Sequence, residues 1–238
     1  MGESRKFNVI VADPSWAYSN LRTGGSMTSG SAAKYDGQTM ALEDIEQLPV
    51  AGVCSDDAVL FLWVTVPVLD YGFEVMKAWG FSYKTSVFWV KTGRLGMGYW
   101  FRGQVEVVLF GVRGKIKAFR TAERNMIQSV PGPHSSKPKE FRDFVERVTV
   151  SIPDRKRLEL FAVGDSPGWT SLGYGADGVD LRDSLVAIAA NAPVGECPVC
   201  GKLFQCLGKI APRHVSNYGT ALSFCLGSGE ETKKVLMV

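Results

Sequence analysis

Stretches rich in apolar residues alternate along this chain with stretches in which apolar residues recur at helical spacing. The first kind predicts strands over residues 7–12, 58–64, 81–90, 104–111 and 157–163. The second kind predicts helices over residues 42–48, 68–79, 138–148 and 176–191. Because strands and helices alternate, we expect βαβ units, a mainly parallel sheet and an α/β fold.

Length and composition narrow the class of protein. At 238 residues, the chain has room for one α/β domain and a small appendage. Hydrophobic residues make up 45% and charged residues 21%, which excludes a disordered chain, and the net charge of +3 alone does not indicate nucleic acid. No apolar run approaches the roughly 20 residues that cross a bilayer. The N-terminus resembles neither a signal peptide nor a myristoylation motif, so we expect a cytoplasmic protein without a membrane partner.

The first strand ends in the tetrad Asp13-Pro14-Ser15-Trp16. Proline ends the strand, which places Asp13 and Trp16 at its carboxyl end, where open α/β sheets bind ligands. The Asp13 carboxylate and the Pro14 carbonyl can accept both hydrogens of an exocyclic amino group, which frees the nitrogen lone pair to attack a methyl sulfonium in line. The Trp16 indole offers a face for base stacking, worth roughly 1–3 kcal/mol. The alternative is a strand-to-turn junction with a buried tryptophan.

Three other parts of the chain each have two interpretations. Residues 19–36, rich in serine, glycine and threonine, are either a flap over the substrate or a mobile surface loop. Residues 91–103 carry glycine, basic and aromatic residues, so they either contact phosphates and bases or serve as a connector. Glu106, a lone acid in an apolar strand, is either a pocket-facing group or a satisfied core acid. Trp63, Trp79 and Trp89 are expected in the core.

The tetrad resembles the Asp-Pro-Pro-Trp signature of the MT-A70 family of S-adenosylmethionine-dependent adenine-N6 methyltransferases. Longer matches lie within residues 78–114, including Gly98-Tyr99-Trp100 and Leu109-Phe110-Gly111. Further matches are His134-Ser135-Ser136-Lys137-Pro138, Glu159-Leu160-Phe161, and the pair Trp169 and Gly173. The resemblance runs from about residue 7 to residue 174 and points to compact bacterial and phage members.

The resemblance implies a Rossmann-like sheet in the permuted order of the β-class amino methyltransferases, with base-binding residues first and cofactor-binding residues last. The implied catalytic residues are Asp13, Pro14, Ser15 and Trp16. The implied cofactor-binding residues are Ala12, Asp13, His134, Lys137, Glu159, Phe161 and Gly173, with Lys137 near the methionine end of S-adenosylmethionine. DNA is the expected substrate rather than RNA, and a duplex would have to release the target base by flipping it out.

Three positions depart from the family pattern. Ser15 replaces the second proline, Val163 stands where many members have an arginine, and Tyr174 stands where an asparagine is common. These changes bear on cofactor affinity more than on the reaction, because Asp13, Pro14 and Trp16 are retained. They leave two alternatives open: an RNA adenine-N6 methyltransferase, and a non-catalytic nucleic-acid-binding relative of the same fold.

The last part of the chain has its own cysteine pattern. Cys197-Pro-Val-Cys200-Gly has the spacing of a zinc knuckle; His214 and Cys225 are the expected further ligands, and Cys206 is the rival fourth ligand. The segment resembles small modules appended to phage and actinobacterial proteins, and the alternative is a tail of free cysteines. Methyl transfer needs no metal, so the zinc would be structural or help to grip nucleic acid. We therefore expect a methyltransferase domain at 1–176, a helix and linker at 177–193, and a zinc-binding module at 194–238.

Overall fold

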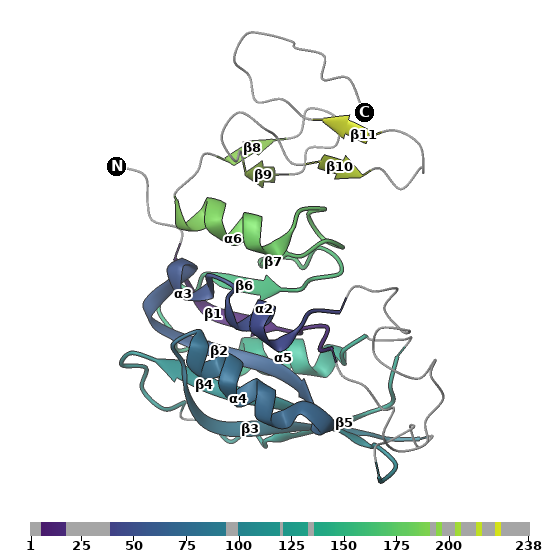
Figure 1. The fold of residues 1–238 in the computed structure, drawn as a ribbon. Helices are drawn as coiled ribbons and strands as arrows, with labels where there is room; N and C mark the ends of the chain where they lie inside the picture. Colours follow the sequence, from purple (N-terminus) through teal and green to yellow (C-terminus); the bar gives the residue numbers. More distant parts are fainter. Residues whose placement is uncertain are drawn as a thin grey trace, which may run out of the picture.

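A seven-stranded sheet forms the centre of the molecule (Figure 1). The structure, a computed structural model, describes residues 6–17, 39–93, 100–119, 121–132 and 136–190, and the backbone of four short strands beyond residue 190. The strands are β1 Phe7–Ala12, β2 Cys54–Thr65, β3 Ser82–Lys91, β4 Val105–Arg113, β5 Met126–Ser129, β6 Arg157–Leu160 and β7 Thr170–Leu172. Their order in the sheet is β5-β3-β4-β2-β1-β6-β7.

The sheet is mainly parallel, which confirms the α/β fold expected from the sequence. β1 pairs in parallel with β2 and β6, β6 with β7, and β3 with β5. Only β4 is reversed among these strands, and it pairs antiparallel with β2 and β3. The first residues of β4 therefore lie at the edge of the sheet where the other strands end.

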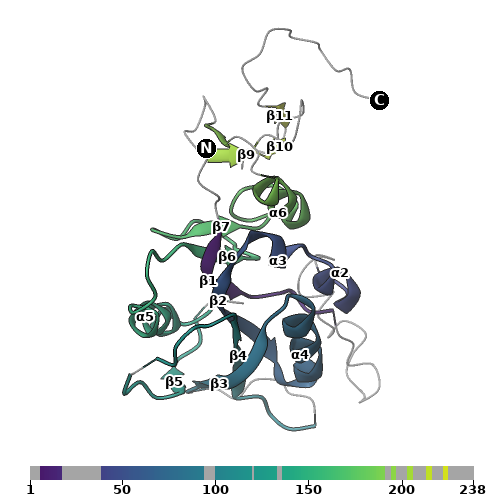
Figure 2. The same ribbon diagram turned by 90° about the vertical axis from the view of Figure 1, so that its left-hand side faces the viewer.

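Helices cover both faces of the sheet (Figure 2). The short helices α2 Leu42–Glu46 and α3 Val50–Val53 lie on one face with α4 Leu69–Ala78 and α6 Leu181–Ala189, and a 3₁₀ turn, η2 Val66–Val68, leads into α4. The helix α5 Lys139–Val148 lies on the other face. Each face thus closes over its own apolar core.

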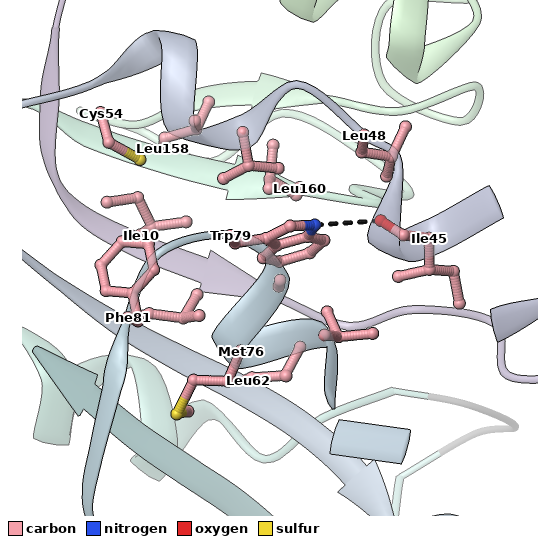
Figure 3. Close-up of a cluster of buried hydrophobic side chains, with 14 of the residues drawn as sticks. Ile10, Ile45, Leu48, Cys54, Leu62, Met76, Trp79, Phe81, Leu158 and Leu160 are labelled. Atoms are coloured by element: carbon pink, nitrogen blue, oxygen red, sulfur yellow. Dashed lines mark hydrogen bonds between the residues drawn. The ribbon is translucent and has the colours of Figure 1, made fainter. Parts of the chain in front are cut away.

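Trp79 lies in the middle of the larger core (Figure 3). Its side chain is buried, and the indole Nε1 donates a hydrogen bond to the Ile45 carbonyl oxygen at 2.9 Å. Ile10, Leu62 and Leu160 pack in the same core from three neighbouring strands. The expectation that Trp63, Trp79 and Trp89 are core residues is confirmed, because all three are buried.

The smaller core fixes α5 against the sheet. Phe141 and Phe144 from α5 pack with Trp63, Trp89 and Ile127. The ring centroids of Phe141 and Trp63 lie 4.6 Å apart in an edge-to-face arrangement, which aromatic pairs favour. The N-terminus of α5 is therefore held next to the strands that carry the candidate site.

The folded unit continues past residue 176. The helix expected at 176–191 begins only at Leu181, because the Asp180 side chain caps it by accepting a hydrogen bond from the Arg182 amide nitrogen at 2.9 Å. Leu181, Leu185 and Ile188 pack into the larger core. The segment expected to be a helix and linker thus contributes a helix to the main domain.

Two short hairpins follow α6. β8 Val194–Glu196 pairs antiparallel with β9 Leu203–Gln205, and β10 Arg213–Val215 pairs antiparallel with β11 Leu222–Phe224. The proposed zinc ligands Cys197, Cys200 and Cys225, the rival Cys206 and the side chain of His214 lie outside the described residues. Within the described residues, no group of three or more histidine, cysteine or acidic side chains is arranged to hold a metal ion. None of the described helices is long and apolar enough to span a membrane.

Candidate active site

A cluster of charged side chains lies at the edge of the sheet where β1, β2 and β3 end. Asp13 follows β1, Lys91 is the last residue of β3, and Glu106 is the second residue of the reversed strand β4. Lys137 joins them from the segment before α5. Because side chains alternate between the two faces of a strand, residues two positions apart share a face. The residues two positions from Asp13, Lys91 and Glu106 are Val11, Trp89 and Val108, and all three belong to the core under α5. The three strand-borne charges therefore share the α5 face.

The four charges form one connected network. The Lys137 Nζ lies 2.7 Å from Asp13 Oδ1 and 3.5 Å from Glu106 Oε2. The Lys91 Nζ donates to Glu106 Oε1. Each ammonium also lies over an indole: Lys137 Nζ is 5.1 Å from the centroid of Trp63, and Lys91 Nζ is 4.8 Å from that of Trp89. Carboxylates and aromatic faces thus hold both lysines in place.

The two carboxyl groups have opposite pKa shifts. Desolvation by the surrounding protein raises the pKa of Asp13 above its ordinary value, and the attraction of Lys137 offsets only part of this rise. Desolvation also acts on Glu106, but Lys137 and Lys91 together outweigh it and lower the pKa of that carboxyl. Asp13 is therefore the better proton acceptor of the two, and 36% of its side-chain surface remains exposed.

The backbone of the tetrad is fixed by hydrogen bonds. The Asp13 amide donates to the Leu160 carbonyl at 3.4 Å, and the Trp16 amide donates to the Pro14 carbonyl at 3.0 Å. The Ser15 carbonyl accepts from the Met40 amide at 3.0 Å. These bonds restrain the tetrad although Ser15 stands where the family has a second proline.

The expectation that Trp16 is a stacking platform is not met in this structure. Only 4% of the Trp16 surface is exposed, and the indole packs in the larger core. Its Nε1 donates to the Trp63 carbonyl oxygen at 3.1 Å. Trp16 therefore anchors the tetrad in the core, and its burial does not bear on the roles of Asp13 and Pro14.

Replacing Trp16 tests this burial. We expect Trp16→Ala to lower the free energy of unfolding by about 3–5 kcal/mol, the usual cost of removing a buried large aromatic side chain. Trp100→Ala, at a side chain that is 79% exposed, is the matched control and should change it by less than about 0.5 kcal/mol. Urea unfolding measures both, and equal effects of the two variants would refute the anchoring role.

The end of β6 lies beside Asp13. β1 and β6 pair with Ala12 opposite Leu160, and Glu159 is close enough that its charge contributes to the raised pKa of Asp13. Ala12 is fully buried at the end of β1. The Glu159 carboxylate binds Arg142 Nη2 at 2.6 Å and accepts a hydrogen bond from Ser166 Oγ at 2.8 Å. Glu159 therefore ties β6 to α5 as well as facing the site.

The backbone after β6 adopts an uncommon conformation. Phe161 has a φ of 62°, which non-glycine residues rarely adopt and which costs of order 1–2 kcal/mol. Gly173 has a φ of 153°, and a Cβ there would lie 2.6 Å from the Ala162 nitrogen. Gly173 is thus required by close packing of two backbone segments, beside the strained turn at Phe161. His134 and the proposed flap at 19–36 lie outside the described residues.

Only part of this network can be recognised from the sequence. Glu106 was recognisable as a lone acid among apolar residues, but Lys91 follows an apolar strand like many solvated lysines. The only available signal for Lys91 was its place at the carboxyl end of a strand. Its pairing with Glu106 depends on the reversed direction of β4, which the hydrophobic pattern does not reveal.

Comparison with known proteins shows that the chain is related to methyltransferases. It is 30% identical over 207 residues to the type II methyltransferase M.MunI of a Mycoplasma species, covering 81% of this chain and 85% of that protein. The family model described as MT-A70 matches residues 7–175. The chain belongs to the MT-A70 family, and the resemblance found in the sequence is confirmed.

Longer proteins share the same region. The chain is 30% identical over 191 residues to the N(6)-adenosine-methyltransferase subunit METTL3 of Danio rerio, covering 76% of this chain and 30% of that protein. It is 29% identical over 188 residues to the N(6)-adenosine-methyltransferase catalytic subunit METTL3 of Homo sapiens, covering 75% of this chain and 30% of that protein. The chain thus spans less than a third of the length of these two relatives.

Proposed function

We propose that this chain transfers the methyl group of S-adenosylmethionine to the N6 amino group of adenine in DNA. The observation that carries the proposal is the Asp13 carboxylate, which lies at the carboxyl end of β1 against Lys137, inside the region that matches the family. DNA is favoured over RNA because the chain covers most of the length of a type II methyltransferase and less than a third of the adenosine methyltransferases.

Asp13 and Pro14 would hold the target amino group. Lys137 binds Asp13 Oδ1, and the second carboxylate oxygen can accept one hydrogen of the amino group. The Pro14 carbonyl, which accepts one hydrogen bond from the Trp16 amide, can accept the other hydrogen with its second lone pair. Two acceptors on one amino nitrogen favour a pyramidal geometry that frees its lone pair for attack. The methylated nitrogen must then lose a proton, and the raised pKa of Asp13 suits this carboxylate to receive it.

The residues around the end of β6 fit a cofactor of this kind. The Glu159 carboxylate can accept hydrogen bonds from ribose hydroxyl groups, and the Lys137 ammonium can pair with the carboxylate at the methionine end. When bound, S-adenosylmethionine supplies an electrophilic methyl group. The residues of this chain would position the amino group opposite it, and such positioning can supply much of the rate.

Two measurements separate this proposal from its alternatives. Calorimetry with S-adenosylmethionine should give a saturable heat, whereas no binding would favour the non-catalytic nucleic-acid-binding relative. Labelled S-adenosylmethionine should then transfer its methyl group to a DNA oligonucleotide in preference to an RNA of the same sequence. Transfer to RNA alone would keep the chemistry and overturn the substrate.

We also propose a structural zinc ion on Cys197, Cys200, His214 and Cys225. A short segment with little apolar core gains much of its folding free energy from such an ion. In the native protein, we expect a thiol reagent to label Cys206 but not the three cysteine ligands, and a chelator to expose all of them. Cys54 should stay unlabelled in the folded protein, because burial raises its pKa to about 12. Immediate labelling of every cysteine beyond residue 190 would instead support a tail of free cysteines.

A further inference from the structure

Two adjacent aromatic side chains are unusually exposed. Trp100 is 79% exposed and Phe101 is 85% exposed, more than any other aromatic residue in the described part of the chain. Most large aromatic side chains bury most of their surface, so two exposed neighbours indicate a contact made outside the domain.

The backbone holds Trp100 in a costly conformation. Its φ of 65° lies in the left-handed region, which costs a non-glycine residue of order 1–2 kcal/mol. Within the described residues, only two other non-glycine residues, Asp154 and Phe161, have a positive φ. Strain of this kind persists at binding sites more often than in ordinary connections.

The chain connects the aromatic pair to the charged network over a short stretch. It belongs to the connection between β3, which ends at Lys91, and β4, whose second residue is Glu106. The Lys91 amide donates to the Gln104 carbonyl at 2.8 Å and so closes the base of this connection. Because Trp100 precedes Glu106 by few residues, their Cα atoms are within roughly 20 Å, the reach of an extended chain of that length.

We infer that Trp100 and Phe101 form a surface on which unpaired bases next to the target adenine stack. The inference rests on the proposed function, and it supplies the stacking face that the buried Trp16 does not provide. Stacking on aromatic side chains tolerates any base, because every base has a flat π face. Arg102, which is also exposed and directly follows the pair, can contact the neighbouring phosphate. A nucleic-acid strand fits an aromatic pair beside a basic residue better than an apolar protein surface does.

Fluorescence of 2-aminopurine tests the contact without any methyl transfer. The full chain would be titrated into a single-stranded DNA oligonucleotide with 2-aminopurine on either side of one adenine. Stacking should quench the fluorescence, and Trp100→Ala and Phe101→Ala should each remove quenching and weaken binding by roughly 5- to 100-fold. Trp100→Tyr should restore both, and Phe73→Ala, at an aromatic residue on α4 that is 41% exposed, is the matched control.

The outcomes separate this inference from the proposed function. Unchanged quenching and affinity in Trp100→Ala and Phe101→Ala would overturn the inference, even if the wild-type chain methylates adenine. Quenching that depends on the pair, without any methyl transfer, would support the inference and refute the proposed reaction. Sedimentation tests a third outcome. If the wild-type chain self-associates and Trp100→Ala is monomeric but still binds DNA, the aromatic pair is an interface between copies of the chain. That result would also overturn the inference.

Discussion

Asp13→Asn is expected to reduce methyl transfer by about two to three orders of magnitude, the loss seen when one preorganised polar group is removed from an active site. The amide keeps the shape of the carboxylate and an oxygen for Lys137, but it loses the charge that accepts hydrogens from the amino group. It also cannot receive the proton that the methylated nitrogen must release. Single-turnover kinetics with labelled S-adenosylmethionine measure the loss.

Asp143→Asn provides the matched control for this experiment. Asp143 lies on α5 in an exposed pair with Lys139, at 3.5 Å, and takes no part in the charged network. The rate for this variant should stay within about a factor of two of the wild type, as for most surface substitutions. An unchanged circular dichroism spectrum and an unchanged urea unfolding midpoint would show that Asp13→Asn is folded. Full activity of Asp13→Asn would remove Asp13 from the reaction.

Lys137→Met should shift the pH dependence of the reaction as well as its rate. In the wild type, Lys137 opposes the desolvation that raises the pKa of Asp13, so removal of the ammonium raises this pKa further. Since the reaction requires the ionised carboxylate, activity rises with pH through the pKa of Asp13. The acidic limb of the pH–rate profile should therefore move to higher pH, with a rate loss of about a hundredfold near neutral pH.

Lys139→Met separates this effect from a general loss of positive charge. Lys139 lies two positions further along and is 88% exposed. Its replacement should leave both the rate and the position of the acidic limb unchanged. An acidic limb in Lys137→Met that stays in place or moves to lower pH would contradict the assigned coupling between Lys137 and Asp13.

Local patterns predicted the elements of this fold well. β1 has the expected bounds, because Lys6 precedes its largely apolar run and Asp13-Pro14 follows it. The strands β5 and β7, of four and three residues, were not predicted, since so short a run carries no reliable period. The reversed direction of β4 was also missed, because direction depends on connections and pairing instead of on hydrophobicity.

The site was predictable where a residue's place along a strand determines its role. Asp13 was expected at the carboxyl end of β1 and lies there, whereas the pair that Lys137 forms with Asp13 was not predicted. Trp16 shows why local sequence has limits. Its exposure depends on Trp63 and Met40, which are distant in sequence and meet it only in the folded chain. The ion pair between Lys91 and Glu106 likewise depends on how the strands pair in the folded chain, which local sequence does not reveal.

The position of the transferred methyl group tests the central claim most directly. DNA incubated with the purified chain and S-adenosylmethionine would be digested to nucleosides and analysed by mass spectrometry. We expect N6-methyldeoxyadenosine as the product, and at least about a hundredfold less of it with Asp13→Asn in the same time. Methylation of cytosine, methylation of adenine at a ring nitrogen, or no methylation by a folded protein that binds the cofactor would contradict the assignment of Asp13 and Pro14 to the amino group of adenine.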